Sequence, residues 1–381
     1  MDQRINNILA KETDRQHSTV ELIASENFAS EAVMQLAGSV FTNKYAEGYP
    51  GKRYYNGCEH MDEIEQLAID TLCNLYGANY ANVQPHCGAN ANTAVYQALM
   101  EPGDRLLGMD LASGGHLSHG SAPNISGKVY DCYAYGVNAD GLLDYDAIRA
   151  QAEEVRPHVI VAGASAYPRI IHWEIFREIA DSVDAYLVVD MAHYSGLIAG
   201  GAYPNPVPYA DVVTSTTHKT LRGPRGGIIL WNDAGLSRYI NSAIFPGTQG
   251  GPLMHIIAAK AQCFVEADTQ DYKNYAQAVV RNAQAMCDVF NSNGINVLTG
   301  GTDSHIILID LSDSKHSGRE AADLLEANGI TVNKNGVPND PRSFVETSGI
   351  RIGTAAETTR GYDEEWFKNL ALKICQILNG Q

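Results

Sequence analysis

The sequence has 381 residues, of which 45% are hydrophobic and 35 are glycine, a size and composition typical of a globular α/β enzyme with one large core and a smaller one. Its formal net charge of −17 argues against nucleic acid or an anionic membrane as the main partner. The seven cysteines lack CxxC spacing, which favours reduced thiols over a disulfide framework or a zinc site. No secretory signal or bilayer-spanning apolar run is visible, so we expect a cytoplasmic protein.

The first part of the chain contains two unusual stretches. Residues 1–17 are polar with a sparse apolar stripe, which predicts a helix that needs another surface to pack on. Residues 42–57 are rich in tyrosine and glycine, too irregular for a helix or strand and too aromatic for a solvated linker. Long structured loops are more often functional than structural, although a tyrosine-rich packing loop is an alternative.

Strand and helix patterns alternate from residue 60 to residue 231. We expect a helix at 60–76 closed by Gly77, then a strand, a glycine turn and a helix between 80 and 100. A further helix is expected at 173–183, and further strands at 104–109, 158–162, 186–189 and 210–213. The turn before 228–231 is too short for a helical crossover, so this strand should be antiparallel to its predecessor. The alternation predicts a mostly parallel sheet with the functional site at the carboxyl ends of its strands.

The pattern changes near residue 255, which we take as a domain boundary. Downstream we expect a helix opened by the capping box Ser317–Glu320, two amphipathic helices at 271–293 and 364–378, and short strands at 306–311, 330–333 and 350–354. The predicted organisation is an N-terminal arm (1–34), a large α/β domain (35–255) and a small α+β domain (256–381).

Two polar residues at strand ends suggest a cofactor site. Lys219 follows a buried strand beside His218, and such a lysine can be desolvated enough for its amine to form an imine with an aldehyde. Asp190 ends another strand, where a buried carboxylate needs a cation such as a protonated pyridine nitrogen. The pair points to pyridoxal phosphate. A surface lysine and an aspartate that caps the next helix are the structural alternatives.

The same sheet edge offers groups for the rest of that cofactor. Backbone N–H groups at Gly88 and Ala89, where a helix begins, could hold the phosphate, His116 could stack on the ring, and His193 could orient Asp190. Arg351 could clamp a substrate carboxylate or form a structural ion pair. The histidines lack HExxH or HxH spacing, so we expect no metal site.

Several motifs closely resemble those of the serine hydroxymethyltransferase family, namely residues 21–27, 43–55, 114–120, 189–193, 216–227, 245–255 and 348–354. The resemblance covers nearly the whole chain. It implies the pyridoxal-phosphate-dependent transferase fold type I and an obligate homodimer, possibly a tetramer, with shared active sites and small-molecule substrates. The implied reaction converts serine and tetrahydrofolate reversibly to glycine and methylene-tetrahydrofolate through an imine of the cofactor on Lys219.

Family roles carry over to individual residues. The resemblance implies a catalytic set of Lys219, Glu47, His116, Asp190, Tyr55 and Thr216. The cofactor set comprises Lys219, Gly88, Ala89, His116, Ser165, Asp190, His193, Thr216, His218, Tyr45 and Gly251. Amino-acid substrate is implied to contact Ser25, Glu47, Tyr55 and Arg351, and folate to contact Glu47, Tyr54, Leu111, Gly115, Leu117 and Asn335. Tyr45, Tyr55, Gly250 and Gly251 match groups lent by the neighbouring subunit, and Arg225 matches an arginine that supports the site.

Two departures from the family pattern bear on ligand binding. Cys87-Gly88-Ala89 stands where the family usually has Ser-Gly-Ser, and a lost hydroxyl–phosphate hydrogen bond costs about 1.5–3 kcal/mol, so we expect weaker cofactor binding. Ser-Phe-Val-Glu-Thr at 343–347 replaces Ser-Pro-Phe-Val-Thr, and Glu346 would add an anion near anionic folate. The alternative function is therefore a folate-independent aldolase or transaldolase acting on β-hydroxy amino acids. A third hypothesis, a catalytically weak regulatory subunit, conflicts with the retained Lys219 and Arg351.

Overall fold

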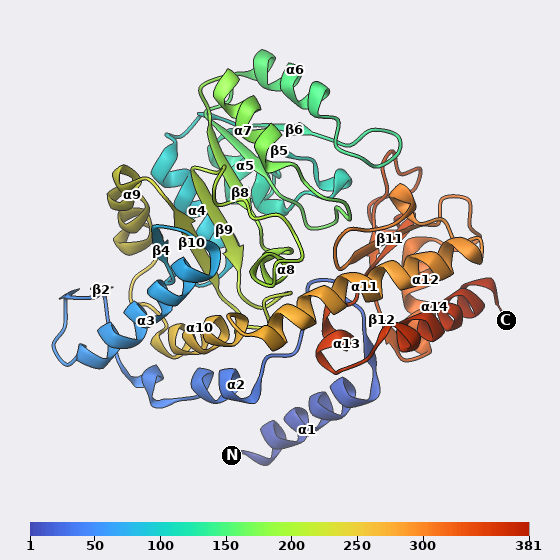
Figure 1. The fold of residues 1–381 in the computed structure, drawn as a ribbon, viewed down its shortest axis with the longest axis horizontal. Coiled ribbons are helices and arrows are strands. Elements are labelled where there is room, and N and C mark those ends of the chain that lie inside the picture. The colour runs from blue at the N-terminus through green and yellow to red at the C-terminus, as the bar shows by residue number, and fades with distance from the viewer. Residues whose placement is uncertain (381) are drawn as a thin grey trace.

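The computed structural model describes residues 1–380, and its centre is a seven-stranded mixed sheet (Figure 1). The strand order is β4-β10-β9-β8-β7-β5-β6. Five strands run parallel: β9 (Val212–Thr216), β8 (Tyr186–Asp190), β7 (Val159–Ala162), β5 (Arg105–Met109) and β6 (Asp131–Tyr135). β10 (Gly227–Trp231) is antiparallel to both β9 and β4 (Tyr80–Asn82). The predicted mostly parallel sheet and the reversed direction of residues 228–231 are confirmed.

Each central strand alternates its side chains between two apolar cores. In β7, Val159 and Val161 pack with α4 (Gly88–Leu99) and α9 (Ser237–Ser242). Ile160 and Ala162 face the larger core, which α3 (Glu59–Tyr76), α7 (Trp173–Ser182) and α10 (Met254–Ala267) help to build. Because both faces are covered, these strands are continuous apolar runs. The remaining helices of this region are α2 (Glu31–Ala37), α5 (Ile125–Val129), α6 (Tyr145–Val155) and α8 (Ser195–Ala199).

The smaller part of the molecule is built on a three-stranded antiparallel sheet, β11 (Ile306–Asp310), β14 (Gly349–Gly353) and β13 (Asn333–Asn335). Its helices are α12 (Gly318–Ala327), α13 (Ala355–Thr359) and α14 (Glu364–Asn379). The long helix α11 (Gln270–Ser292) joins the two parts (Figure 1), because Tyr272 and Val279 lie in the larger core whereas Met286 and Phe290 lie in the smaller one. The α+β character is confirmed, and the residue numbers of the domain boundaries stay a prediction.

The N-terminal segment reaches the small domain. α1 (Gln3–Ser18) lies at the edge of the molecule (Figure 1), and every one of its residues is exposed. β1 (Val20–Glu21) then pairs in parallel with β12 (Ile330–Thr331), and Leu22 enters the smaller core. The tyrosine-rich stretch contains a short hairpin of β2 (Gly48–Tyr49) and β3 (Lys52–Arg53). Among residues 1–380, none of the helices has the length and apolar character that a membrane crossing requires.

Candidate functional site

A cleft of about 620 Å³ opens between the large sheet and the small domain. Many of the predicted site residues line it: Ser25, Gly88, Ala89, Leu111, Gly115, His116, Leu117, Ser165, His193, Thr216, His218, Lys219, Arg225, Asn335 and Arg351. A smaller adjoining pocket shares several of these residues and adds Asp190 and His119. Residues that are far apart in the sequence therefore meet at the carboxyl ends of the parallel strands, as the alternation predicts.

Lys219 lies three residues beyond the end of β9. This strand continues to Thr216 instead of ending at Val213, because its buried hydroxyls find partners, such as Asn92 Oδ1 for Thr214 Oγ1 at 2.6 Å. The Lys219 ammonium donates to Thr216 Oγ1 at 3.0 Å. Burial lowers the pKa of Lys219 to about 8, Asp190 opposes this shift, and the nearby Arg351 and Arg225 add to it. The amine is therefore much closer to its neutral, nucleophilic form than an exposed lysine.

The backbone around Lys219 is held by side chains from distant elements. Asn27 Nδ2 donates to the Lys219 carbonyl at 3.0 Å. The next carbonyl, that of Thr220, accepts from the hydroxyls of Tyr272 at 2.9 Å and Tyr275 at 3.0 Å. Thr220 Oγ1 donates to the His193 carbonyl at 2.8 Å. The turn that carries the lysine is therefore tied to α11, to the N-terminal segment and to the turn after β8.

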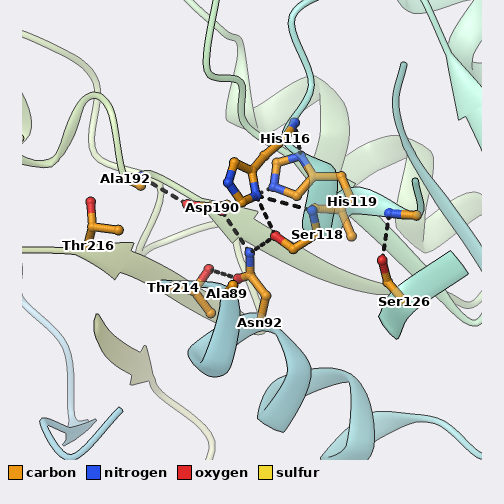
Figure 2. Close-up of polar contacts among 12 residues, drawn as sticks. Ala89, Asn92, His116, Ser118, His119, Ser126, Asp190, Ala192, Thr214 and Thr216 are labelled. Carbon is orange, nitrogen blue, oxygen red and sulfur yellow. Dashed lines mark hydrogen bonds and ion pairs between the residues drawn. The ribbon is translucent and has the colours of Figure 1, made fainter. Parts of the chain in front are cut away.

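Asp190 ends β8 in the adjoining pocket, and its two oxygens have different partners (Figure 2). Oδ1 accepts from the Ala192 N–H at 3.0 Å, so part of the carboxylate caps the following turn. Oδ2 accepts from Asn92 Nδ2 at 2.8 Å and lies 3.1 Å from His119 Nε2. Burial acts to raise the pKa of Asp190, but the hydrogen bond and charge of His119 lower it overall. The carboxylate is therefore an anion directed at the pocket.

The expectation that His193 orients Asp190 is wrong, because His119 and Asn92 take that contact (Figure 2). Neither was predicted. His119 follows His116 by three residues in a glycine-rich loop, and Asn92 lies one turn into α4, four residues after Gly88; these spacings were the available signals. His193 Nδ1 is buried and has no hydrogen-bond partner among residues 1–380, as expected of an atom that faces a bound ligand.

The start of α4 provides an anion site. Its N-cap residue, Cys87, makes no side-chain capping bond, so the first N–H groups of the helix stay available to a ligand. A Cβ on Gly88 would lie 2.7 Å from Thr216 Cγ2, so only glycine allows this approach to β9. His218 Nδ1 is a second buried atom without a partner in the described chain. Available N–H groups, orphaned ring nitrogens and a buried anion fit pyridoxal phosphate.

His116 has the properties of a neutral aromatic wall. Burial lowers its pKa to about 4, and its Nδ1 lies 2.7 Å from Ser118 Oγ. His116, His119 and Asp190 offer ligand atoms within 4.8 Å of one another, so they are the group in the described chain that could hold a metal. However, Ser118 already contacts His116, and Asn92 and Ala192 already donate to Asp190. The donor N–H of a pyridinium therefore suits the carboxylate better than a metal ion.

Arg351 on β14 reaches the cleft from the small domain. Its hydrogen bonds go to uncharged acceptors, the Ser165 carbonyl at 2.5 Å and Asn333 Oδ1 at 3.0 Å, instead of the ion pair that was the structural alternative. Burial lowers its pKa to about 10, which leaves it charged at neutral pH. An anion in the cleft would therefore be its charge partner.

A second group of predicted residues lies outside this cleft. Tyr45, Glu47, Tyr54, Tyr55, Gly250 and Gly251 are not among its lining residues in the described chain. They gather elsewhere: the Tyr45 and Tyr55 rings are 5.4 Å apart, and Gly251 lies against Tyr45. All three tyrosines are exposed. The predicted site residues of one chain thus form two separate clusters.

The loop 343–347 differs from expectation. The Glu346 carboxylate accepts from Ser317 Oγ at 3.1 Å and pairs with Arg319 Nη1 at 3.4 Å, at the start of α12. Phe344 and Thr347 line the cleft in its place, together with Lys334. The Glu346 carboxylate that we expected near folate therefore does not line the cleft in the described chain, because the α12 N-terminus and Arg319 attract it.

Comparison with known proteins agrees with this geometry. Residues 1–374 match the family model described as serine hydroxymethyltransferase. The chain is 57% identical over its full length to serine hydroxymethyltransferase of Psychrobacter sp. strain PRwf-1, covering 91% of that protein. It is 58% identical over 97% of its length to serine hydroxymethyltransferase 1 of Pseudomonas fluorescens, covering 89% of that chain. It is 56% identical over its full length to serine hydroxymethyltransferase of Wolbachia pipientis, covering 89% of that protein. This chain therefore belongs to the serine hydroxymethyltransferase family.

Proposed function

We propose that this protein interconverts serine and glycine, with tetrahydrofolate carrying the one-carbon unit and pyridoxal phosphate bound at Lys219. The family has the pyridoxal-phosphate fold type I, and its members catalyse this transfer. One observation carries the proposal: Lys219 and Asp190 extend from neighbouring parallel strands into one pocket. An amine with a lowered pKa and a buried carboxylate on neighbouring strand ends suit the aldehyde and the ring nitrogen of that cofactor.

Four parts of the pocket would hold the cofactor. Lys219 would bond its aldehyde carbon, Asp190 its ring N–H, and the α4 N-terminus at Gly88 and Ala89 its phosphate. His116 would cover one face of the ring. When bound, the cofactor supplies an electron sink for the pair released at the substrate α-carbon. The neighbouring His119 and Asn92 keep Asp190 ionised and correctly turned for that purpose.

Arg351 and Ser25 would bind the substrate carboxylate. Arg351 is buried with uncharged hydrogen-bond partners, so a bidentate carboxylate would satisfy its charge. Arg225 and Lys334 also line the cleft. A cationic cleft in a chain of net charge −17 selects anionic ligands locally while the rest of the surface repels them.

The outer part of the cleft suits folate. Leu111, Leu117 and Phe344 offer apolar walls, and Asn335 offers an amide beside them. Glu346, which would have repelled an anionic folate, is paired with Arg319 outside the cleft. This placement favours the folate-dependent reaction over the aldolase alternative.

A second copy of the chain would complete each site. Glu47, Tyr45, Tyr55 and Gly251 cluster away from the cleft that they are expected to serve, and the tyrosines are exposed. Supplied by a partner, Glu47 would move a proton at the serine hydroxyl. We also propose a cytoplasmic location, which the seven free thiols of the chain support.

The test is covalent trapping followed by a folate-dependence assay. The purified protein should show visible absorbance from bound cofactor, and borohydride reduction followed by peptide mapping should place the adduct on Lys219. Serine consumption should increase on addition of tetrahydrofolate. An adduct on another lysine, or a Lys219→Gln variant with undiminished turnover, would disprove the mechanism, and serine cleavage that ignores tetrahydrofolate would favour the aldolase.

A further inference from the structure

Arg53 is a buried arginine outside the cleft whose contacts surround Glu47. Its side chain is only 3% exposed and donates to Asp62 Oδ1 at 2.8 Å and Glu65 Oε2 at 2.6 Å. Its Nη1 donates to the carbonyls of Ala46 and Gly48, each at 3.0 Å. These two residues flank Glu47 in the chain. One guanidinium therefore fixes the backbone on both sides of the predicted proton-transfer residue.

The rest of the hairpin leaves Glu47 little backbone freedom. The Glu47 carbonyl accepts from the Tyr54 N–H at 3.0 Å. Gly48 has φ +98°, and a Cβ there would lie 2.3 Å from the Lys52 carbonyl oxygen. Ala46 is fully buried. The Glu47 side chain is consequently carried by a rigid turn, so its location depends on the contacts of Arg53.

A continuous polar network leads from Arg53 to the start of α4. Glu65 Oε1 accepts from Gln84 Nε2 at 2.7 Å, and the same amide donates to the Gly48 carbonyl at 2.9 Å. The carbonyls on both sides of Gln84, those of Val83 and Pro85, accept from Lys260 Nζ at 2.7 and 3.1 Å. The third donor of this ammonium goes to the Gly227 carbonyl at 2.8 Å, so all three are used. Two residues after Pro85, the turn reaches Cys87, the N-cap of α4.

We propose that Arg53 is a positioning residue for Glu47. We also propose that the hydrogen bonds of Arg53, Glu65 and Gln84, together with those of Lys260 to the carbonyls on both sides of Gln84, join the Glu47 turn to the turn that opens α4. This inference rests on the proposed function, in which Glu47 serves the site of a second copy and α4 serves the site of its own chain. The network therefore links the part of the site that the chain would lend with the part that it would keep. None of its four residues lines the cleft in the described chain, so each acts through other residues.

Arginine fits position 53 because five acceptors surround it in different directions, two carboxylates and the carbonyls of Ala46, Gly48 and Met61. A lysine has three donors on one nitrogen and cannot reach two carboxylates and three carbonyls together. Arg53→Lys should therefore keep the buried charge and part of the stability but release the backbone beside Glu47. Misplacement of a reacting group by about 1 Å costs on the order of 10²-fold in rate.

The test compares Arg53→Lys with Arg177→Lys in the holoenzyme. Arg177 serves as the control because it also pairs with two carboxylates, Asp181 and Asp211, and donates to a carbonyl, that of Ala185. It lies on α7, apart from the hairpin that carries Glu47 (Figure 1), and its side chain is more exposed than that of Arg53, 23% against 3%. We expect kcat for serine to fall about 10²-fold in Arg53→Lys, with KM within a few-fold, while Arg177→Lys keeps kcat within about twofold. The Tm of both variants is measured alongside, so that a loss of stability is compared separately from the loss of kcat. If Arg53→Lys does not fold, Glu65→Gln, which keeps the side-chain volume, replaces it in this comparison of kcat.

The second arm measures the dissociation constant of pyridoxal phosphate by absorbance titration. Lys260→Met should raise it about tenfold by releasing the turn before α4, and the Glu65→Gln and Lys260→Met effects should be non-additive if the network is continuous. A kcat in Arg53→Lys equal to that of Arg177→Lys would overturn the positioning role, and additive effects would overturn the link. A wild-type protein that forms no adduct at Lys219 would instead overturn the proposed function, so the two failures are distinguishable.

Discussion

The lowered pKa of Lys219 gives the most direct prediction for the site. Burial lowers this pKa to about 8 from an ordinary 10.5, the charge of Asp190 opposes the shift, and the charges of Arg351 and Arg225 add to it. At pH 7 an amine with this pKa is neutral roughly 300 times more often than one with the ordinary value. Since only the neutral amine attacks an aldehyde, Lys219 of the apoprotein should take up pyridoxal phosphate far faster than a surface lysine does.

The assay is the rate of visible absorbance change when apoprotein is mixed with the cofactor across a pH series. The rate should rise about tenfold per pH unit well below the pKa and level off above about pH 8. Two variants should move the midpoint in opposite directions. Arg351→Met removes a cation and should raise the midpoint, whereas Asp190→Asn removes an anion and should lower it. Normalising each profile to its own plateau separates this shift from any change in affinity.

A rate that still rises tenfold per unit beyond pH 9 would show that burial does not lower the pKa of this amine. Movement of both variant midpoints in the same direction would show that Arg351 and Asp190 do not act on Lys219 through their charges. Either result would refute the electrostatic account of the pocket while leaving the fold untouched.

Three further predictions concern the start of α4, the outer cleft and His305, a buried histidine whose ring stacks on that of His193 with centroids 5.6 Å apart. Ala89→Ser should lower the cofactor dissociation constant tenfold or more by restoring a hydrogen bond worth about 1.5–3 kcal/mol; an unchanged titration would contradict this. Burial lowers the pKa of His305 to about 3. Between pH 6.5 and 3 this histidine is therefore protonated in the unfolded chain but neutral in the folded one. The free energy of unfolding should fall by up to about 1.4 kcal/mol per pH unit as the pH drops through this range. Chemical denaturation should show that the free energy of unfolding of His305→Gln depends less steeply on pH than that of the wild type, by the equivalent of one proton. An equal pH dependence in the two proteins would contradict this prediction. Glu346→Gln should leave KM for tetrahydrofolate within about twofold while Lys334→Met raises it, and the reverse order would place Glu346 in the pocket.

The sequence predicted best those elements whose residues are buried on both faces. β7, β8 and β9 are apolar runs because each strand lies between two cores. β6 was missed because it is the edge strand and several of its side chains are exposed, so it carries no apolar run. β9 extends further than expected, because a hydroxyl can enter a core when a partner such as Asn92 meets it.

Site residues that follow a strand, such as Lys219 and Asp190, could be recognised because their backbone positions are set by the sheet. Residues that act through tertiary contacts could not. Nothing near His119 in the sequence distinguishes it from His193 as the partner of Asp190, since that choice depends on how a loop folds over the sheet. Lys260 lies among alanines on a buried helix, where a lone lysine signals a specific acceptor, but the acceptors themselves come from other elements.

The carbonyls of Lys219 and Thr220 are each anchored by side chains of distant elements, which limits where movement can occur during turnover. If the Lys219 amine bonds the cofactor as proposed, its nitrogen would have to move during turnover, whereas its Cα lies on a turn held by the hydroxyls of Tyr272 and Tyr275 and the amide of Asn27. The displacement is therefore confined to rotations about the four methylenes of the lysine. The anchored turn would therefore let the amine move while the Cα and the strand β9 beneath it keep their positions.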